Sequence, residues 1–353
     1  MQRDELVQRW LRWAGVLTSV AAWGALALAA AVWFLLGWAD YHWLGTLLAF
    51  GPRWVLLAAV VILAICAAFW RPRALVPLGL AGAVVAGPVT GLCVPMRAWW
   101  QGSTSRPMLR VLTCNTLVGR ANGQLAALIA REQPDVVALQ EWPADQPLPA
   151  PLAEDWHVVR DQGLVLASRW PITASEPLAS PLGWKRTLGL RGQVELATGP
   201  TQVYVLHLST PREGLEAVLA HGWDGLAVLE EVTAKREVEA AVVGEWLGKC
   251  SGSMVVAGDF NMTSESAIYR RHFGRLQNAF SAAGCGWGAT KVTRFHSVRI
   301  DHVLGSAPWQ FSRCKVGPDV GSDHRPVIAD LEFRQAATAK SLSRDSQRTH
   351  DDS

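Results

Sequence analysis

Residues 255–263 read VVAGDFNMT, and this stretch constrains the fold more strongly than its neighbours do. An apolar run rich in β-branched residues that stops at Gly258 is typical of a buried strand reaching its end. Asp259 and Asn261 follow one residue apart, so in an extended chain their side chains point to the same side. Such a pair either closes the strand in an Asx-rich turn or faces a substrate. The stretch alone leaves both interpretations open.

Similar short apolar segments recur through the rest of the C-terminal part. They predict strands over 109–113, 136–140, 164–168, 203–207, 254–257, 300–305 and 327–333. Helical spacing predicts an amphipathic helix over 123–133 and a longer one over 226–247. The expected apolar face of the longer helix comprises Leu229, Val232, Val238, Val242 and Trp246. Because strands and helices intermingle without a strict βαβ alternation, we expect an α/β fold with mixed sheets rather than a doubly wound one.

The first hundred residues have a different composition. They contain three runs without a charged residue, over 14–38, 54–70 and 74–96. A bilayer core needs about 20 apolar residues of helix, so the runs predict three membrane spans. A cleaved signal peptide has a single apolar core of about 7–15 residues, which does not match three runs. The alternative is two spans with a re-entrant or interfacial segment.

Basic residues predict the orientation of these spans, because they are enriched on the cytoplasmic side. Three arginines precede the first run and two separate the second from the third, whereas only Arg53 lies between the first two. The N-terminus is therefore expected in the cytoplasm and the chain beyond residue 97 outside it. The predicted organisation is a cytoplasmic segment 1–13, a membrane domain 14–96, a linker 97–108, a globular domain 109–334 and a disordered polar tail 335–353.

Charge and cysteine usage exclude some functions. Residues 97–334 contain 24 Lys plus Arg and 24 Asp plus Glu, a net charge of zero, whereas proteins that grip duplex nucleic acid usually have a basic face. The basic triplets 270, 271, 275 and 185, 186, 191 each form either a local basic patch or, the more frequent case, solvated surface. No cysteine spacing matches a zinc site. The cysteines outside the apolar runs, Cys114, Cys250, Cys285 and Cys314, are expected to be buried thiols.

Polar residues accumulate where the predicted strands end. They are Asn115 after RVLTC, Glu141 after VVALQ, His207 after VYVL, Asp259 and Asn261 after VVAG, Asp301 in RIDHVL, and Asp323 with His324 in SDHRPV. Each one alone has an ordinary explanation, such as an Asn turn, a surface Glu or a satisfied core His. Those explanations do not account for so many apolar strands ending in carboxylates, amides and imidazoles.

With these motifs the chain resembles the endonuclease/exonuclease/phosphatase superfamily, which includes deoxyribonuclease I, apurinic endonucleases, bacterial sphingomyelinases and inositol-phosphate 5-phosphatases. The resemblance covers residues 109–333. It rests on RVLTCNT, DVVALQE, GLVLASRWPI, VLHLSTP, VAGDFN, RIDHVL and SDHRPV, in the family's order. It implies a four-layered α/β sandwich, two packed sheets flanked by helices, with the site at the edge where these strands end.

The resemblance also implies metal-assisted hydrolysis of a phosphate ester. Glu141 would be the first Mg²⁺ ligand, with Asn115 and Asp323 beside it, since Mg²⁺ prefers oxygen ligands. Mn²⁺ is the expected substitute. Asp259 would orient or deprotonate the attacking water, and Asn261 would donate to a phosphoryl oxygen. Whether one or two metal ions act is left open.

Two histidines and an arginine complete the implied site. His324 would contact the phosphate, with Asp301 fixing its tautomer. His207, in HLSTP, is a candidate general acid, and which histidine protonates the leaving group stays open. Arg169, in ASRWP, is a candidate phosphate contact, with a surface salt bridge as the alternative. His302 stands where many family members carry an aromatic residue, so we expect it to serve packing.

The function predicted from these features is a membrane-anchored, Mg²⁺-dependent phosphodiesterase or phosphomonoesterase with its catalytic domain outside the cytoplasm. Its partners would be the lipid bilayer and a phosphate ester, whether a lipid headgroup, a nucleic acid or a soluble phosphate; no protein partner is indicated. The segment 211–235 is expected to form a lid beside the site. The alternatives are an extracytoplasmic nuclease, which the neutral charge disfavours, and a catalytically idle membrane-tethered binding module, which the complete residue set disfavours.

Overall fold

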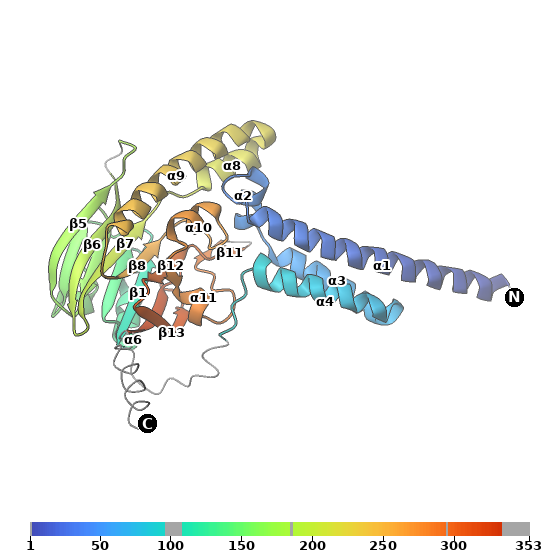
Figure 1. Cartoon of the computed structure of the whole chain (residues 1–353), viewed down its shortest axis with the longest axis horizontal. Coiled ribbons are helices and arrows are strands. Elements are labelled where there is room, and N and C mark those ends of the chain that lie inside the picture. The colour runs from blue at the N-terminus through green and yellow to red at the C-terminus, as the bar shows by residue number, and fades with distance from the viewer. Residues whose placement is uncertain (1, 96–107, 184–185, 294–295, 334–353) are drawn as a thin grey trace, which may run out of the picture.

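The computed structural model describes residues 2–95, 108–183, 186–293 and 296–333, which form a helical N-terminal part and a globular part (Figure 1). Apart from Met108, the predicted linker 97–108 and tail 335–353 lie outside the described residues. In Figure 1 the long helices of the N-terminal part extend away from the globular part, and the N-terminus lies at their far end.

Two six-stranded mixed sheets form the globular part, with strand orders β13-β14-β1-β2-β4-β3 and β5-β6-β7-β8-β12-β9. The strands of the first sheet are β1 (Leu109–Asn115), β2 (Val136–Gln140), β3 (His157–Asp161), β4 (Leu164–Ser168), β13 (Trp309–Val316) and β14 (Val327–Phe333). Those of the second are β5 (Ile172–Ala179), β6 (Thr187–Leu196), β7 (Gly199–His207), β8 (Ser253–Asp259), β9 (Gln277–Asn278) and β12 (Asp301–Gly305). A separate ribbon pairs β10 (Lys291–Val292) with β11 (Ser297–Val298).

Most helices of the globular part cover the outer faces of the two sheets, and one packs in the core between them. Their bounds are α6 (Asn122–Glu132), α7 (Ala150–Ala153), α8 (Arg212–His221), η3 (Gly222–Gly225), α9 (Leu226–Gly248), α10 (Ala267–Phe273) and α11 (Ala279–Ala283). Helices α6 and α7 pack on the first sheet, and α9 and α10 on the second, with α8 lying against α9. This is the four-layered α/β sandwich that the motifs implied.

The core between the sheets ends in polar residues at one edge. Alternate residues of each strand point into this core, as Val255 and Ala257 do in β8. The residues that continue the inner faces of β1, β7 and β8 past the apolar core are Asn115, His207 and Asp259. The strand period therefore places these three side chains between the sheets, where the apolar side chains stop.

The buried face of α9 differs from the prediction. Val238 is 42% exposed and Val242 is only half-buried, whereas Arg236 and Glu239 are fully buried. Periodicity assigned the charged residues to solvent, but a buried charge is tolerated when it is paired and hydrogen-bonded. Arg236 meets that condition because it pairs with Asp40.

The N-terminal part consists of α1 (Gln2–Leu36), α2 (Trp43–Phe50), α3 (Trp54–Trp70), η1 (Pro72–Ala74), α4 (Leu75–Val84) and η2 (Val85–Val89). Two stretches, Glu5–Leu36 and Pro72–Val89, are long and apolar enough to cross a membrane among the described residues. Helices α2 and α3, bent by 78° at their junction, make a third only if the pair counts as one span. The predicted runs 14–38, 54–70 and 74–96 thus correspond to α1, α3 and α4–η2, the last of which ends at Val89.

Buried polar contacts join the two parts. Asp40, in the turn after α1, accepts from Arg236 Nη1 at 2.7 Å, and both side chains are at most 1% exposed. Ser266 donates to the same carboxylate. Farther along the chain, Cys93 and Gly286 exchange two backbone hydrogen bonds of 2.8 and 2.9 Å. The helical part is therefore packed against the globular part at two separate places.

The basic triplet at 270, 271 and 275 is exposed, as predicted, but two of its arginines also contact the N-terminal part. Arg270 donates to the Gly37 carbonyl, and Arg271 donates to Tyr41 Oη at 2.9 Å. Both acceptors lie in the turn that follows α1, a contact that the local sequence does not specify.

The described cysteines are all free thiols. Cys114 and Cys314 are buried as predicted, and burial raises the pKa of both. Cys250 is half-buried and Cys285 is exposed, so the prediction of buried thiols holds for two of the four.

Candidate active site

Sheet register brings most of the predicted site residues together. β7 and β8 are parallel with His207 opposite Asp259, and β12 runs antiparallel to β8 with Asp301 opposite Asp259. In the other sheet, β1 and β2 are parallel with Asn115 opposite Gln140, so Glu141 follows beside it. Both sheets therefore present polar side chains at the same edge.

Gly258 allows β7 and β8 to approach closely just before Asp259. Its φ is 150°, and a Cβ at this position would lie 2.0 Å from the Leu206 carbonyl oxygen. Only glycine fits such a contact. Gly258 therefore allows the close pairing of β7 and β8 that places Asp259 opposite His207.

Asn115 connects the two sheets. Its Nδ2 donates to Glu141 Oε1 at 3.0 Å and to Asp259 Oδ2 at 3.1 Å, while its Oδ1 accepts from Leu117 N at 3.1 Å. As placed, Asn115 offers its nitrogen to the site and holds two carboxylates close together. This differs from the oxygen ligand that the resemblance implied.

Asn261 orients the Asp259 carboxylate. Its backbone N donates to Asp259 Oδ1 at 2.9 Å, and its Nδ2 lies 2.8 Å from the Leu208 carbonyl and 3.3 Å from Asp259 Oδ2. Asn261 and Glu141 both have left-handed backbone conformations, with φ of 50° and 56°. Such strained residues concentrate at functional sites, where the surrounding structure holds them.

His324 is held between two carboxylates. Its Nδ1 lies 2.9 and 3.1 Å from the Asp301 oxygens, and its Nε2 lies 3.8 Å from Asp259 Oδ2. Burial lowers the pKa of His324, but the charge and hydrogen bond of Asp301 and the charge of Asp259 raise it to about 9. Burial and the Asp301 charge raise the pKa of Asp259 to about 7. The three groups form a buried cluster whose ligand atoms lie within 4.8 Å of one another.

His207 lies near Asp259 as well, and also near Glu141. Its Nε2 lies 3.6 Å from Glu141 Oε1 and 3.8 Å from Asp259 Oδ2. Burial and the nearby Arg186 charge lower the pKa of His207 to about 4. The two histidines thus flank Asp259 in different electrostatic surroundings.

Arg186 is a site residue that the sequence did not predict. Its Nη2 donates to the His207 carbonyl at 2.8 Å, and its side chain lines a cavity together with His207 and Asp259. Of the triplet predicted to be solvated surface, Lys185 lies outside the described residues and Arg191 pairs with Glu176 at 2.7 Å on the surface. The prediction therefore holds for Arg191 and fails for Arg186.

Asp323 and Lys291 lie beside His324 at the edge of this cluster of polar residues. Lys291 Nζ donates to Asp323 Oδ2, whereas Asp323 Oδ1 is buried, has no hydrogen-bond partner among the described residues, and lies 3.9 Å from His324 Nε2. Lys291, on β10, is the second residue that the sequence did not predict. An unsatisfied buried carboxylate oxygen is costly unless another positive group occupies its surroundings.

Most of the polar residues described above line a cavity with a volume of about 680 Å³; Asp301 and Asp323 do not. Its polar floor consists of Asn115, Glu141, His207, Asp259, Asn261 and His324. Its walls come from α2 and the turn after it, from α8, and from Thr293, His296, Val298 and Ile300. The segment 211–235, predicted to be a lid, does lie beside the site, because α8 forms one wall.

Arg169 does not join the site, contrary to the prediction. β4 is antiparallel to β2 with Ser168 opposite Val136, the first residue of β2, so Arg169 lies at the opposite end of that strand from the site. Its Nε donates to the Pro134 carbonyl at 3.0 Å, and its guanidinium stacks on Trp156 at 4.9 Å. The SR pair resembles the family motif in sequence, but strand direction carries it to the far edge.

His302 packs in the interior, as predicted. Its Nε2 lies 2.8 Å from the Met262 carbonyl, and its ring lies against Phe260 and Tyr269. Burial lowers the pKa of His302 to about 4.

Lowering the pH should destabilise the protein partly through His302. Between pH 6.5 and 4 the unfolded chain binds a proton that the folded chain does not, so stability falls as pH falls, by about 3 kcal/mol in total. His302→Phe should therefore lose less Tm than wild type between pH 7 and pH 4.5. Thermal unfolding of the full chain measures this, with exposed His157→Phe as the control, and an unchanged pH dependence in His302→Phe would contradict it.

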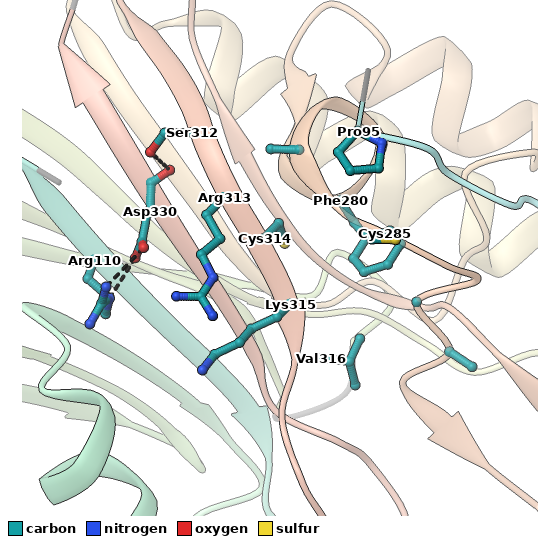
Figure 2. Close-up of a pocket in the computed structure, with 13 residues that line it drawn as sticks. Pro95, Arg110, Phe280, Cys285, Ser312, Arg313, Cys314, Lys315, Val316 and Asp330 are labelled. Carbon is teal, nitrogen blue, oxygen red and sulfur yellow. Dashed lines mark hydrogen bonds and ion pairs between the residues drawn. The ribbon is translucent and has the colours of Figure 1, made fainter. Parts of the chain in front are cut away.

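A second cavity, with a volume of about 730 Å³, lies along β13 (Figure 2). Three of its charged residues are paired: Arg110 Nε lies 2.6 Å from Asp330 Oδ1, and Lys315 Nζ lies 2.6 Å from Glu132 Oε2. Figure 2 shows the first of these pairs at one side of the hollow. No histidine lines this cavity among the described residues, so the first cavity is the candidate active site.

The chain matches a family model described as the Endonuclease/Exonuclease/phosphatase family over residues 112–324, more than half of its length. Among solved structures, an endonuclease/exonuclease/phosphatase from Beutenbergia cavernae is 22% identical, with 67% of this chain and 74% of that chain covered and a TM-score of 0.49. A functionally unknown conserved protein from Enterococcus faecalis V583 is 16% identical, with 64% and 100% covered and a TM-score of 0.50. A mannosyl-6-phosphatase from Bacteroides thetaiotaomicron is 18% identical, with 64% and 100% covered and a TM-score of 0.47. No curated protein matches the chain.

Proposed function

Because the chain belongs to the endonuclease/exonuclease/phosphatase family, we propose that it is a membrane-anchored, Mg²⁺-dependent phosphoesterase. The observation that carries this proposal is the arrangement of His324 and Asp259 on the floor of a cavity, with Asp301 bound to His324 and with Glu141 and Asn115 beside Asp259. Fold alone does not identify a reaction, but acid, base and cation-binding groups converging on one cavity do indicate one.

The residues present fit a divalent cation that prefers oxygen ligands. Asn115 holds the Glu141 and Asp259 carboxylates together, and Asp323 retains a buried oxygen without a hydrogen-bond partner among the described residues. Glu141 and Asp323 would hold the ion, with Asn115 contributing if its amide turns over. When bound, Mg²⁺ or its substitute Mn²⁺ would neutralise charge on the phosphoryl oxygens.

The protein groups would then orient water and move protons. Asp259, fixed by Asn115 and Asn261, would orient the attacking water and accept its proton. His324 has Nδ1 committed to Asp301, so its Nε2 is the atom left to face the phosphate. Each histidine Nε2 lies 3.8 Å from Asp259 Oδ2, and either His324 or His207 would protonate the leaving oxygen.

Replacing Glu141 with glutamine should raise the Mg²⁺ concentration required for half-maximal rate by about tenfold or more, because even indirect support of a metal ligand is worth that much. The Glu141 side chain is 31% exposed, so Tm should change little. Calorimetric titration with Mn²⁺ should show the same weakening of metal binding in Glu141→Gln without requiring activity. The control is the exposed Glu154→Gln, and an unchanged Mg²⁺ requirement in Glu141→Gln would show that Glu141 is not a ligand.

The proposal includes a location. We place residues 1–13 in the cytoplasm, 14–96 in the membrane and the catalytic domain, 109–334, on the other side. The two apolar helices, the bent pair α2–α3 counted as a third span, and the distribution of arginines support this arrangement. The 35 residues of α1 make a helix of about 52 Å, longer than the roughly 30 Å bilayer core, and the globular part lies at only one end of it. A C-terminal reporter active only in the cytoplasm would contradict the orientation.

The substrate class is tested with the full chain in phospholipid nanodiscs. Three panels are incubated with Mg²⁺ or EDTA: plasmid and RNA, phospholipid vesicles, and soluble inositol and sugar phosphates. We expect EDTA-sensitive release from at least one panel. Cleavage of nucleic acid alone would favour the nuclease alternative, which the net charge of zero in residues 97–334 disfavours. No release from any panel would favour an idle binding module.

A further inference from the structure

We propose that the substrate carries a hydrocarbon chain that lies between α2 and α8 while its phosphate reaches Asp259 and His324, an inference that rests on the proposed phosphoesterase function. The active-site cavity has two chemically different halves. Its floor is the polar cluster, whereas Leu47 and Phe50 of α2 and Leu215 of α8 line its walls. A cavity of about 680 Å³ is in the size range of small-molecule pockets, which are mainly apolar with a few convergent polar groups.

The α2 wall is held in place by the globular part. Trp43, at the start of α2, meets Trp223 of η3 edge to face at a centroid distance of 5.2 Å. At the other end of α2, the Phe50 ring lies 5.9 Å from the Arg236 guanidinium, which is itself bound to Asp40. Helix α2 is therefore a fixed side of the cavity, although it belongs in sequence to the helical part.

Exposed aromatic and apolar side chains lie on the α8 side of the cavity. Leu219 of α8 is 81% exposed and also lines the cavity, and Trp223 is 74% exposed. Tryptophan is enriched at the membrane–water interface, so these side chains are placed to lie at the bilayer surface. A lipid could then enter between α2 and α8 without its chain crossing water.

The cationic lining argues against a nucleic-acid polymer. The cavity contains Arg186, Arg212 and Lys291, but Arg186 donates to the His207 carbonyl and Lys291 pairs with Asp323. A polymer that is gripped along its phosphates needs a row of available cations. The walls supply aliphatic carbon instead, which stabilises a hydrocarbon chain by removing it from water.

A homologous series of substrates distinguishes binding of the hydrocarbon chain from hydrolysis of the phosphate ester. Methyl, butyl, octyl and dodecyl 4-nitrophenyl phosphates all break the same P–O bond: water adds its oxygen to phosphorus, 4-nitrophenolate leaves, and the alkyl phosphate remains. With the full chain in nanodiscs, kcat/KM should rise by about tenfold or more from methyl to dodecyl, since each buried methylene contributes favourably. Partitioning into the bilayer raises the long-chain concentration equally for all variants, so the decisive quantity is the difference between variants.

The double variant Leu215→Asn, Leu219→Asn places polar side chains on the α8 wall. It should lower the ratio of kcat/KM for the dodecyl substrate to that for the methyl substrate by about tenfold. The control is Val238→Asn, since Val238 is an exposed residue of α9 outside the cavity and its substitution should preserve the ratio. A ratio that is equal in the double variant and in wild type would overturn the proposed chain site.

A photoreactive probe gives a second readout that does not require turnover. Dodecyl phosphate with a terminal diazirine should label peptides from α2 and α8, and unlabelled dodecyl phosphate, but not methyl phosphate, should compete. Nitrophenolate release without chain-length preference and without such labelling would overturn the chain site and leave the phosphoesterase intact. Competable labelling of α2 and α8 without release from any ester would support the chain site and overturn the proposed hydrolysis.

Discussion

Asp259→Asn should lower kcat by about 10²–10⁴-fold, the usual contribution of a positioned base, without a large change in Tm. Asp259 is 1% exposed, and burial with the Asp301 charge raises its pKa to about 7, so the folded protein holds this carboxylate at a cost. Asparagine removes that cost but also removes an oxygen that accepts from Asn115 or Asn261. The two effects on stability oppose each other, whereas the loss of the base is uncompensated.

Asp330→Asn is the matched control for this experiment. Asp330 is another buried aspartate, but it pairs with Arg110 at 2.6 Å beside the second cavity rather than the first. Its substitution should lower Tm and preserve kcat, the reverse of the Asp259 pattern. Wild-type kcat in Asp259→Asn, measured on the substrate identified by the panels, would remove Asp259 from the mechanism.

Arg236→Met should destabilise the protein by about 3–5 kcal/mol, the usual cost of leaving one member of a buried ion pair alone. The unpaired group would be Asp40, which is 1% exposed and keeps only its hydrogen bond from Ser266 for the charge. Arg236 Nη2 also donates to the Asn261 carbonyl at 2.9 Å, so kcat should fall as well. Thermal unfolding in nanodiscs measures the first effect and steady-state kinetics the second.

Two further variants decide whether the pair itself is responsible. Adding Asp40→Asn to Arg236→Met removes the stranded charge and should restore much of the lost stability; asparagine also tolerates the φ of 76° at this position. Arg191→Met breaks a surface pair, 34% and 50% exposed, and should cost less than about 1 kcal/mol. Equal losses in Arg236→Met and Arg191→Met would contradict the assigned role of the buried pair.

The strands that sequence predicts are those whose neighbours bury them on both sides. β2, β4 and β14 begin and end at the predicted residues, because each is a mainly apolar segment with a neighbouring strand on both sides. β5 escapes prediction because it is an edge strand with mostly exposed residues, so no apolar run marks it. β6 escapes because Gly189 and Gly192 leave room for side chains of the facing layers, which lowers its apolar content.

The site is predictable to the extent that its residues follow apolar strands in the chain. Arg186 and Lys291 give no such signal, because an arginine or lysine in a polar stretch is usually exposed, and only the fold turns these two inward. Arg169 carries a motif signal, but a motif does not state which end of a strand faces the site. The catalytic motifs do not predict that α2 lines the cavity, because this contact depends on how two distant parts of the chain pack together.

The buried pair between Asp40 and Arg236 has a practical consequence for anyone who shortens the protein to make it soluble. A fragment of residues 109–334 would retain every catalytic side chain named above. It would also leave Arg236 without its counter-ion and open the cavity on the side that Leu47 and Phe50 now close. Substrate preferences and melting temperatures measured on such a fragment would describe an enzyme with a missing wall, and its affinity for long-chain substrates would be underestimated most.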